Sequence, residues 1–316
     1  MVHVRVLVTG GAGFIGRNLC ARLAYEHEVT VVDDFRSSSL GSLEEIGVRV
    51  KSLDVSDQEV IALGSEGWDS IIHLAAETSV EDSFSRPGEF LSVNTVGTLN
   101  LLTVAAANAS HFLLASSASV YGRNEESPHS EQSWVQPISP YAASKMAAEG
   151  LAYSFSERFE LPVAVCRFFN VFGPFQQPDH AYSAVVPKFA AQALREVPLT
   201  VFGDGHQSRD LVPVEFVCEV LTRLSESRRN VPQPIPIATG QSIEVGELAT
   251  RIIQLAASTS SIQYLEGRQG EVRHSQGDPS LLFSLLPGLD VPHLDASLQK
   301  TLDWMRGFLG HEVTRD

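Results

Sequence analysis

Residues 9–16 read Thr-Gly-Gly-Ala-Gly-Phe-Ile-Gly and carry the clearest signal in the chain. They follow an apolar run at 4–8, which predicts a buried strand, and precede residues 17–25, which predict a helix. A turn this tight needs residues without a Cβ, so that N–H groups at the start of the helix can approach a pyrophosphate. A second predicted strand, 29–33, follows within about thirty residues, as dinucleotide-binding units require. The stretch therefore predicts a dinucleotide-binding turn rather than a purely structural one.

The composition fits a soluble chain with one large domain and a smaller lobe. Its 316 residues are 43% apolar and carry a net charge of −15, which argues against nucleic acid and anionic membranes as partners. Cys20, Cys166 and Cys218 show no disulfide or zinc spacing, and the ten histidines form no ligand cluster, so we expect no metal. Neither a signal peptide nor a run of roughly 18 apolar residues is visible, and we expect a cytoplasmic protein.

Apolar strands alternate with helical stretches through the first 170 residues, with further strands near 48–52, 69–74, 111–116 and 163–168. This alternation predicts an α/β fold, a doubly wound parallel (Rossmann) sheet covered on both faces. We expect the dinucleotide domain to occupy 1–170 and to take back a segment near 231–240, with a strand at 235–238. Residues 171–316 are expected to form a smaller, discontinuous and mostly helical lobe. Its helices are predicted near 181–195, 213–226, 244–256 and 294–309.

The ends of the predicted strands supply candidate cofactor residues. Asp33 closes the second strand, where a carboxylate can accept hydrogen bonds from both hydroxyls of an adenosine ribose and repel a 2′-phosphate. This favours NAD over NADP, although Arg36 leaves the choice open. Asp54 stands where a carboxylate can meet an adenine amino group, or it caps the helix that follows. Together with the glycine turn, the expected cofactor residues are Gly10, Gly13, Phe14, Ile15, Gly16, Asp33, Asp34, Ser37, Asp54, Val55, Leu74, Ala75, Ala76 and Asn94.

A serine cluster and a Tyr-Lys pair mark the predicted reaction site. Residues 116–122 read Ser-Ser-Ala-Ser-Val-Tyr-Gly directly after the fifth strand. Tyr141 and Lys145 share one face of a long helix at 140–160, and both are expected to contact the cofactor. A phenol ionises near pH 10, but an ammonium group and an oxidised nicotinamide both favour the phenolate, so Tyr141 is predicted to be a base. Asn94, in the apolar helical stretch 86–107, either ties the end of the sheet to the active-site helix or faces solvent.

With these motifs the chain resembles the extended short-chain dehydrogenase/reductases, in particular the NAD-dependent nucleotide-sugar epimerases and dehydratases. Further family-like segments are His-Leu-Ala-Ala at 73–76, Arg-Phe-Phe-Asn-Val-Phe-Gly-Pro at 167–174, Val-Phe-Gly-Asp-Gly at 201–205 and Gln-Ser-Arg-Asp at 207–210. The resemblance implies that Tyr141 is the catalytic base, that Lys145 holds the nicotinamide ribose, and that Ser117 hydrogen-bonds the reacting sugar hydroxyl. It also implies a homodimer that pairs through the helices near 90–107 and 140–160.

By the same resemblance, the substrate lies mainly against residues after 170. Asn170, Arg209 and Arg268 are expected to meet a sugar diphosphate, since the planar fork of arginine suits phosphate oxygens; Arg268 is otherwise a surface residue. The nucleobase wall is expected from 185–189 and 201–202. Asp210 and Glu271 are expected to orient the ribose or an arginine. The predicted substrate residues are Ser117, Ser119, Asn170, Val186, Lys188, Val201, Phe202, Arg209, Arg268 and Ser275.

Positions 118 and 119 bear on which reaction of the family this chain performs. By resemblance, dehydratases carry an acidic residue or two just before the Val-Tyr-Gly step, and decarboxylating relatives usually keep a Glu at position 119. Here these residues are Ala118 and Ser119, which cannot act as the strong base that removes a proton from carbon. We therefore expect a 4-epimerase that forms a 4-keto sugar and returns the hydride to its other face. A 4,6-dehydratase is the alternative if Glu77 or Glu125 supplies the base.

The sugar is expected to be that of UDP-glucose/galactose or UDP-GlcNAc/GalNAc. By resemblance, Ser275 aligns with a bulky tyrosine of glucose-only epimerases, so this small residue leaves space for a 2-acetamido group. Uronate-specific relatives tend to carry an arginine where this chain has Phe175, and a buried carboxylate without a partner is costly. UDP-glucuronate 4-epimerisation is therefore an alternative, and an NAD-binding regulatory protein is the alternative from another class.

Overall fold

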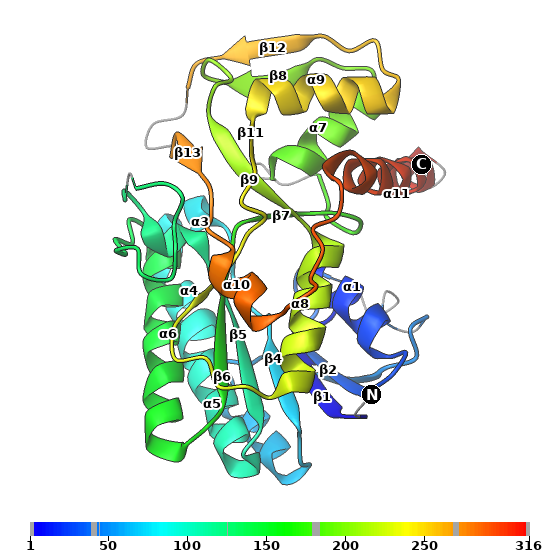
Figure 1. The fold of residues 1–316 in the computed structure, drawn as a ribbon. Coiled ribbons are helices and arrows are strands. Elements are labelled where there is room, and N and C mark those ends of the chain that lie inside the picture. Colours follow the sequence, from blue (N-terminus) through cyan, green and yellow to red (C-terminus); the bar gives the residue numbers. More distant parts are fainter. Residues whose placement is uncertain are drawn as a thin grey trace.

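The computed structural model describes residues 3–38, 43, 45–124, 126–178, 184–267 and 272–313. Its centre is a parallel sheet of seven strands in the order β10-β6-β5-β4-β1-β2-β3 (Figure 1). The strands are β1 (Arg5–Thr9), β2 (Glu28–Asp33), β3 (Arg49–Ser52), β4 (Ser70–His73), β5 (His111–Ser117), β6 (Val163–Phe168) and β10 (Ile235–Ile237). All the strands predicted for the sheet are present, and the α/β Rossmann fold is confirmed.

Alternating burial along the strands explains why helices cover both faces of the sheet. In β1, the side chains of Val6 and Val8 pack with residues of α1 (Phe14–Leu23) and α8 (Val214–Ser227). Leu7, between them, packs with residues of α5 (Gly97–Asn108) and α6 (Pro140–Phe159). Figure 1 shows these two helix pairs on opposite sides of the sheet. Burial on both faces is typical of parallel strands and produces the continuous apolar runs of the sequence.

The stretch predicted as one helix at 86–107 consists of three pieces. After the short helix α3 (Val80–Ser85), α4 (Pro87–Leu91) runs into a π-helical turn, η2 (Ser92–Val96), and then into α5. The whole run Pro87–Asn108 is long and apolar enough to cross a membrane, which the sequence analysis did not expect, but 56% of its most apolar window is buried inside the protein. Because α5 packs against β4, β5 and α6, the run is a core helix of the Rossmann part.

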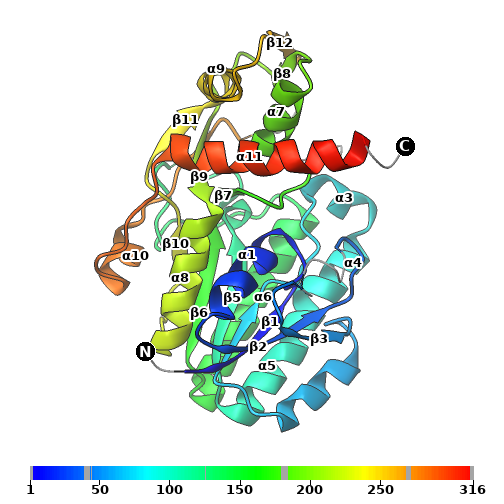
Figure 2. The same cartoon turned by 90° about the vertical axis from the view of Figure 1, so that its right-hand side faces the viewer.

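The second lobe is mixed rather than mostly helical. It contains the helices α7 (Val185–Leu194), α9 (Val245–Ala256) and α11 (Leu294–Val313), and α10 (Ser280–Leu285) lies nearer the sheet, against β10. Its strands are β7 (Asn170–Phe172), β8 (Leu199–Phe202), β9 (Ser208–Pro213), β11 (Ser242–Glu244), β12 (Ile262–Leu265) and β13 (His274–Ser275). β9 pairs with β7, β11 and β13, and β8 pairs with β12. In Figure 2, α11 crosses the molecule where the two lobes meet.

The chain returns to the sheet earlier than the segment near 231–240 suggested. α8 packs against α1, β4 and β5, so it belongs to the Rossmann part although it lies within 171–316. The sheet then gains its edge strand when β10 pairs with β6. Residues 214–237 therefore lie with the sheet, and the second lobe is built from the segments on either side of them.

Candidate active site

A long cleft of about 2210 Å³ runs over the carboxyl ends of the parallel strands. The glycine turn after β1, the ends of β2, β4 and β5, and residues of β7, β9 and β13 line it. The direction in which successive strands are added to the sheet changes between β1 and β4. Open parallel sheets bind ligands at the carboxyl ends of the strands that flank such a point. Of the residues predicted to contact the cofactor, these line the cleft: Gly10, Gly13, Phe14, Ile15, Gly16, Asp33, Asp34, Ser37, Val55, Leu74, Ala75, Ala76, Tyr141 and Lys145.

Two positions of the glycine turn leave no room for a side chain. A Cβ on Gly16 would lie 2.1 Å from the carbonyl oxygen of Gly10. Gly10 itself has a φ of +69°, and a Cβ there would lie 2.7 Å from the backbone nitrogen of Ala75. α1 begins directly after Gly13 without a side-chain cap, so its first N–H groups are available to an anion in the cleft.

The carboxylate of Asp33 is buried at the end of β2, beside this turn. It accepts hydrogen bonds from the backbone N–H groups of Ala12 (3.0 Å) and Phe35 (2.9 Å) and from the Ser38 hydroxyl (3.1 Å). These donors fix the side chain at the position where the sequence predicts the adenosine ribose.

Asp54 does not cap the helix that follows, the alternative that the sequence left open, because this short helix begins at Gln58, after Asp57. One carboxylate oxygen accepts hydrogen bonds from the backbone N–H (2.8 Å) and hydroxyl (2.7 Å) of Ser56, and the other is paired with Arg36. Burial alone would raise the pKa of Asp54, but the hydrogen bonds from Ser56 and the charge of Arg36 lower it. Its neighbour Val55 lines the cleft, whereas Asp54 does not. Protein donors therefore occupy the carboxylate that was predicted to meet adenine.

Ser117, Tyr141 and Lys145 lie together at the floor of the cleft, as predicted. Ser117 ends β5, and the other two lie on the first turns of α6. Tyr141 is 8% exposed and Lys145 5% exposed. The Lys145 ammonium donates a hydrogen bond to the Ala115 carbonyl (2.9 Å), which fixes it beneath the end of β5. Burial lowers the pKa of Lys145 to about 8, and the charge of Glu149 opposes this fall.

The pKa of Tyr141 departs from the sequence expectation. Burial raises it, and a hydrogen-bonding interaction with the Ser117 side chain offsets only part of the rise. From the sequence, Lys145 and an oxidised nicotinamide were expected to lower this pKa. In the protein by itself, however, the cost of placing a phenolate in a buried site dominates. A lowered pKa at Tyr141 therefore requires positive charge from outside the chain.

Asn94 ties the loop after β4 to the helix that carries Tyr141. Its side-chain amide accepts a hydrogen bond from the Glu77 N–H (2.9 Å) and donates to the Glu77 carbonyl (3.0 Å) and the Ser144 hydroxyl (2.9 Å). Ser144 donates in turn to the carbonyl of Tyr141 (2.7 Å). Asn94 is buried within η2, and π-helical turns are frequent at functional sites. The buried tie, rather than the solvent-facing alternative, is what the structure contains, and Asn94 does not itself line the cleft.

His73, at the end of β4, links the end of β1 to α5, a contact that sequence reasoning missed. Its Nδ1 lies 2.7 Å from the Thr9 hydroxyl and its Nε2 lies 3.1 Å from the Thr98 hydroxyl. Thr98 donates to the Asn94 carbonyl (2.6 Å), and Thr9 accepts from the Ala75 N–H (3.2 Å). The imidazole must therefore donate from Nε2 and accept at Nδ1. Burial lowers its pKa to about 3, so it is neutral at physiological pH.

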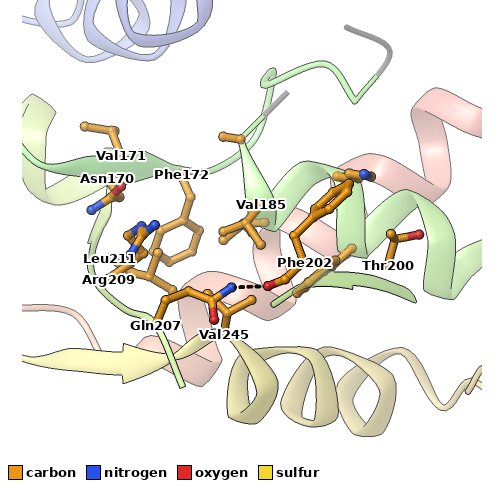
Figure 3. Close-up of a pocket in the computed structure, with 14 residues that line it drawn as sticks. Asn170, Val171, Phe172, Val185, Thr200, Phe202, Gln207, Arg209, Leu211 and Val245 are labelled. Carbon is orange, nitrogen blue, oxygen red and sulfur yellow. Dashed lines mark hydrogen bonds between the residues drawn. The ribbon is translucent and has the colours of Figure 1, made fainter. Parts of the chain in front are cut away.

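A second pocket of about 360 Å³ adjoins the cleft in the second lobe. Asn170 and Arg209 line both cavities and therefore stand at their junction (Figure 3). Inside the pocket, the side chain of Gln207 donates a hydrogen bond to the Phe202 carbonyl (2.7 Å), and the Lys188 ammonium lies 5.0 Å from the centroid of the Phe202 ring. An apolar, aromatic wall with a few placed polar groups suits a flat heterocycle.

One residue of β8 that was predicted to contact the substrate does not line the pocket. Thr200 and Phe202 line the pocket, as Figure 3 shows. Val201, between them, is fully buried in the core of the second lobe and does not line the pocket. Side chains alternate between the two faces of a strand. This alternation, applied to residues 199–202, would have selected Thr200 together with Phe202.

The remaining predicted site residues divide into three groups. Val186 lines the pocket, and Ser119 and Ser275 line the cleft, where the Ser119 hydroxyl is buried without a hydrogen-bond partner among the described residues. Asp210 is a structural residue instead of a ribose or arginine partner, because its carboxylate accepts hydrogen bonds from the N–H groups of Thr239, Gly240 and Gly277. Three residues lie outside the described part of the chain: Glu125, Arg268 and Glu271.

The histidines are not all as isolated as the sequence suggested. Ligand atoms of Glu26, His27 and Glu226 lie within 4.8 Å of one another, close enough to hold a metal ion. In the structure, His27 Nε2 lies 3.2 Å from the Glu226 carboxylate. Because His27 precedes β2, this cluster lies at the amino ends of the strands, away from the cleft.

The fold and the cleft agree with a match to a protein family. Residues 6–240 match the model of the NAD dependent epimerase/dehydratase family. The chain belongs to this family. Its resemblance to the extended short-chain dehydrogenase/reductases, inferred from the motifs, is thereby confirmed.

Relatives of this NAD-dependent epimerase/dehydratase family member are named for different reactions. UDP-glucuronic acid decarboxylase 1 of Xenopus tropicalis is 34% identical over 315 residues, which cover 98% of this chain and 74% of that protein. dTDP-D-glucose 4,6-dehydratase of Homo sapiens is 33% identical over 274 residues, which cover 83% of this chain and 77% of that protein. The structure of UDP-N-acetylglucosamine 4-epimerase from Methanobrevibacter ruminantium M1, in complex with UDP-N-acetylmuramic acid, is 31% identical, with a TM-score of 0.92 over 98% of this chain and 100% of that chain. The family thus fixes an NAD-dependent enzyme that modifies nucleotide sugars.

The residues of the cleft fit NAD. The glycine turn and the open N-terminus of α1 would receive its pyrophosphate, and Asp33 lies where the sequence predicts the adenosine ribose. Arg36, which left NADP open in the sequence, is engaged by the carboxylates of Asp34, Asp54 and Glu89. It therefore does not offer an uncommitted charge to a 2′-phosphate, in agreement with the NAD dependence of the family.

Proposed function

We propose that the protein is a 4-epimerase of a nucleotide sugar. The observation that carries this proposal is the absence of an acid at Ala118 and Ser119, next to Ser117 in the cleft. Dehydration needs a base that takes a proton from carbon, and neither a methyl group nor a hydroxyl can do so at neutral pH. Decarboxylation needs no such base, but by the family resemblance it goes with a Glu at position 119, where this chain has Ser119. Epimerisation at C4 needs only the base that serves the 4-hydroxyl.

In this proposal, Tyr141 takes the proton of the sugar 4-hydroxyl, and Ser117 orients that hydroxyl with a hydrogen bond. Bound NAD supplies a hydride acceptor and a positive charge beside the phenol. Because burial raises the pKa of Tyr141, both this charge and the ammonium of Lys145 are needed to form the phenolate near neutral pH. Lys145 is held within the site by its hydrogen bond to the Ala115 carbonyl. Once the 4-keto sugar has turned in the cleft, return of the hydride to its other face inverts C4.

Two carboxylates near the cleft are poor substitutes for the missing base. Glu77 lines the cleft from the loop after β4 rather than from the segment beside Ser117, and burial, followed by the charge of Glu89, raises its pKa. Glu149 does not line the cleft, and its carboxylate is held by Ser116 and Arg167. Both observations favour the epimerase over the 4,6-dehydratase.

The substrate is proposed to be a UDP-hexose or UDP-N-acetylhexosamine. Asn170 and Arg209, at the junction of the two cavities, suit the diphosphate, and the pocket beyond them suits uracil. Phe175 is packed between the guanidinium of Arg17 (3.9 Å) and the ring of Trp304 (5.5 Å). Phe175 itself carries no cation for the carboxylate of a uronate, although the Arg17 guanidinium beside it also lines the cleft, and the small Ser275 would leave space beside the sugar.

The test is to incubate the purified holoenzyme, without added cofactor, with UDP-glucose, UDP-GlcNAc, UDP-glucuronate and dTDP-glucose. We expect a C4 epimer of unchanged mass from one of the first two. The Tyr141→Phe variant should keep its NAD and lose turnover. Release of CO₂ from UDP-glucuronate, or a 4-keto product lighter by one water, would replace the epimerase by a decarboxylase or dehydratase. NAD binding without turnover of any sugar would favour the regulatory alternative.

We also propose that the enzyme is a cytoplasmic homodimer. Leu91, Val96, Leu99 and Met146 are exposed large apolar side chains on the α4–α5 run and on α6, the two helices implied by the family resemblance. Exposed apolar patches are typical of interfaces, and we propose that these side chains form one. Cys20, Cys166 and Cys218 are all free and buried, which fits a reducing compartment.

A further inference from the structure

Arg36 links three separate segments at the adenosine end of the cleft. Its Nε lies 2.9 Å from the carboxylate of Asp34 in its own loop. One terminal nitrogen is paired with Asp54, which follows β3, and the other lies 3.6 Å from Glu89 on α4. Each nitrogen of the guanidinium thus faces a carboxylate from a different part of the chain. Such a set of partners holds the plane of the group in one orientation.

This bridge borders the part of the cleft where the adenosine is expected. Arg36 lines the cleft together with Asp33, Leu53 and Val55. Its anchor Asp54 is itself fixed by the N–H and hydroxyl of Ser56. Guanidinium planes stack on aromatic faces, and one that is held flat loses little freedom when it does so. An adenine ring in this part of the cleft would therefore meet a preoriented cation on one side.

Arg36 lies among several carboxylates, and their negative charges oppose the binding of an anionic cofactor. The carboxylates near Arg36 include Asp33, Asp34, Asp54, Glu77 and Glu89; Asp34, Asp54 and Glu89 pair with Arg36, and Glu89 also pairs with Arg86. A cofactor that carries a pyrophosphate enters this acidic surrounding at an electrostatic cost. Removal of Arg36 would leave Asp34 and Asp54 without their partner and raise that cost. The bridge contributes little to folding, because the Arg36 side chain is 46% exposed and exposed ion pairs are weak.

We propose that Arg36 is a clasp that closes over the adenosine of bound NAD and slows its release. The ion pairs to Asp54 and Glu89 must open before the adenosine can leave, and they close again behind it. The inference rests on the NAD dependence of the family and not on the reaction proposed above. An enzyme that restores its cofactor to NAD at the end of every turnover has no need to exchange it, and slow release of NAD suits such an enzyme.

The test is the rate at which bound NAD leaves the holoenzyme after dilution into an NAD-capturing buffer, measured by chromatography of the retained nucleotide. Arg36→Ala should raise this rate about tenfold, as expected for loss of a stacked and paired guanidinium. Arg36→Lys, which keeps the charge without the fork, should lie between wild type and Arg36→Ala. Glu89→Gln, which removes one anchor, should raise the rate by a smaller factor.

The matched control is Arg49→Ala. Arg49 also pairs with a carboxylate of β2, Glu28 (3.0 Å), but at the other end of the strand, and its side chain is 70% exposed. This variant should release NAD at the wild-type rate. Added salt should speed release from wild type and leave Arg36→Ala nearly unchanged. Equal release rates for wild type and Arg36→Ala, or an equal acceleration in Arg49→Ala, would overturn the clasp. Because the readout is bound NAD, failure of the epimerase proposal would not affect it.

Discussion

Glu149 and Arg167 form a buried, two-pronged ion pair directly behind the strand that carries Ser117. Arg167 donates from Nε to one oxygen of Glu149 (2.9 Å) and from a terminal nitrogen to the other (2.7 Å). The Ser116 hydroxyl also donates to Glu149, and the Arg167 guanidinium lies 4.9 Å from the centroid of the Tyr121 ring. Glu149 stands two turns after Tyr141 and one after Lys145 on α6, so the pair couples this helix to β6 beneath the candidate site.

Breaking this ion pair should destabilise the protein strongly. Glu149→Gln leaves the Arg167 charge buried without its partner, and we expect a loss of about 3–5 kcal/mol in the free energy of unfolding, measured by urea denaturation. The double variant Glu149→Gln/Arg167→Met removes both charges and should recover a large part of this loss. An unchanged unfolding free energy in the single variant would show that the pair is not desolvated as the structure indicates.

The amide of Asn94 should matter more to turnover than to folding. Asn94→Ala removes the ties to Glu77 and Ser144, so Tyr141 loses its fixed position; we expect kcat to fall about 10²-fold, since small misplacements of reacting groups have this effect. The control is Asn108→Ala, which removes two side-chain hydrogen bonds on the same helical run, to the carbonyls of Gly64 and Val104. Both variants should lose about 1–3 kcal/mol of stability. A similar fall of kcat in the control would contradict the positioning role.

Buried histidines should make the fold sensitive to mild acid. Burial lowers the pKa of His73 to about 3 and that of His111 to about 4, whereas in the unfolded chain both titrate at about 6.5. The unfolded chain therefore binds more protons as the pH drops below about 6.5. Each histidine then reduces stability by up to about 1.4 kcal/mol per pH unit until its folded pKa is reached.

The measurement is the unfolding free energy of wild type and His73→Asn at pH 7, 6 and 5. The variant should start less stable, because it loses the contacts to Thr9 and Thr98, but its stability should fall less steeply with acid. His206→Asn, at an exposed histidine, should keep the wild-type slope. Parallel curves for wild type and His73→Asn would show that His73 is not held neutral.

A charge on the exposed face of α5 should separate the proposed dimer. Leu99→Glu would place a carboxylate among Leu91, Val96 and Met146, and we expect light scattering to give the mass of one chain in place of two. Tyr25→Glu, at a side chain that is 91% exposed after α1, should leave the dimer intact. A monomeric wild type would exclude this interface.

The sequence predicted the Rossmann sheet well because its strands are buried on both faces and appear as continuous apolar runs. It did not predict the strands of the second lobe, which are as short as the two residues of β13 and give too little periodicity to be distinguished from helix or loop. The glycine turn, Ser117, Tyr141 and Lys145 were found because their spacing is local.

Contacts between residues that are far apart in the sequence cannot be predicted from local spacing. The residues next to Asp210 in the sequence give no sign of its hydrogen bonds to Thr239, Gly240 and Gly277. The prediction that Asp210 faces a ligand was therefore wrong. Likewise, the pairing of Arg36 with Glu89 joins residues on separate elements, and only the fold brings them together. A side chain that serves the fold and one that serves a ligand look alike until their partners are known.

The central claim, that C4 alone reacts, is tested most directly by turnover in D₂O with product analysis by NMR and mass spectrometry. An enzyme without a base at Ala118 and Ser119 should give the C4 epimer with no deuterium on carbon, because the hydride returns from the bound cofactor and no C–H proton passes to solvent. Deuterium at C5 or C6, together with a product lighter by water, would contradict the account and show that another side chain supplies the base. A product lighter by CO₂ would contradict it as well and show a decarboxylase.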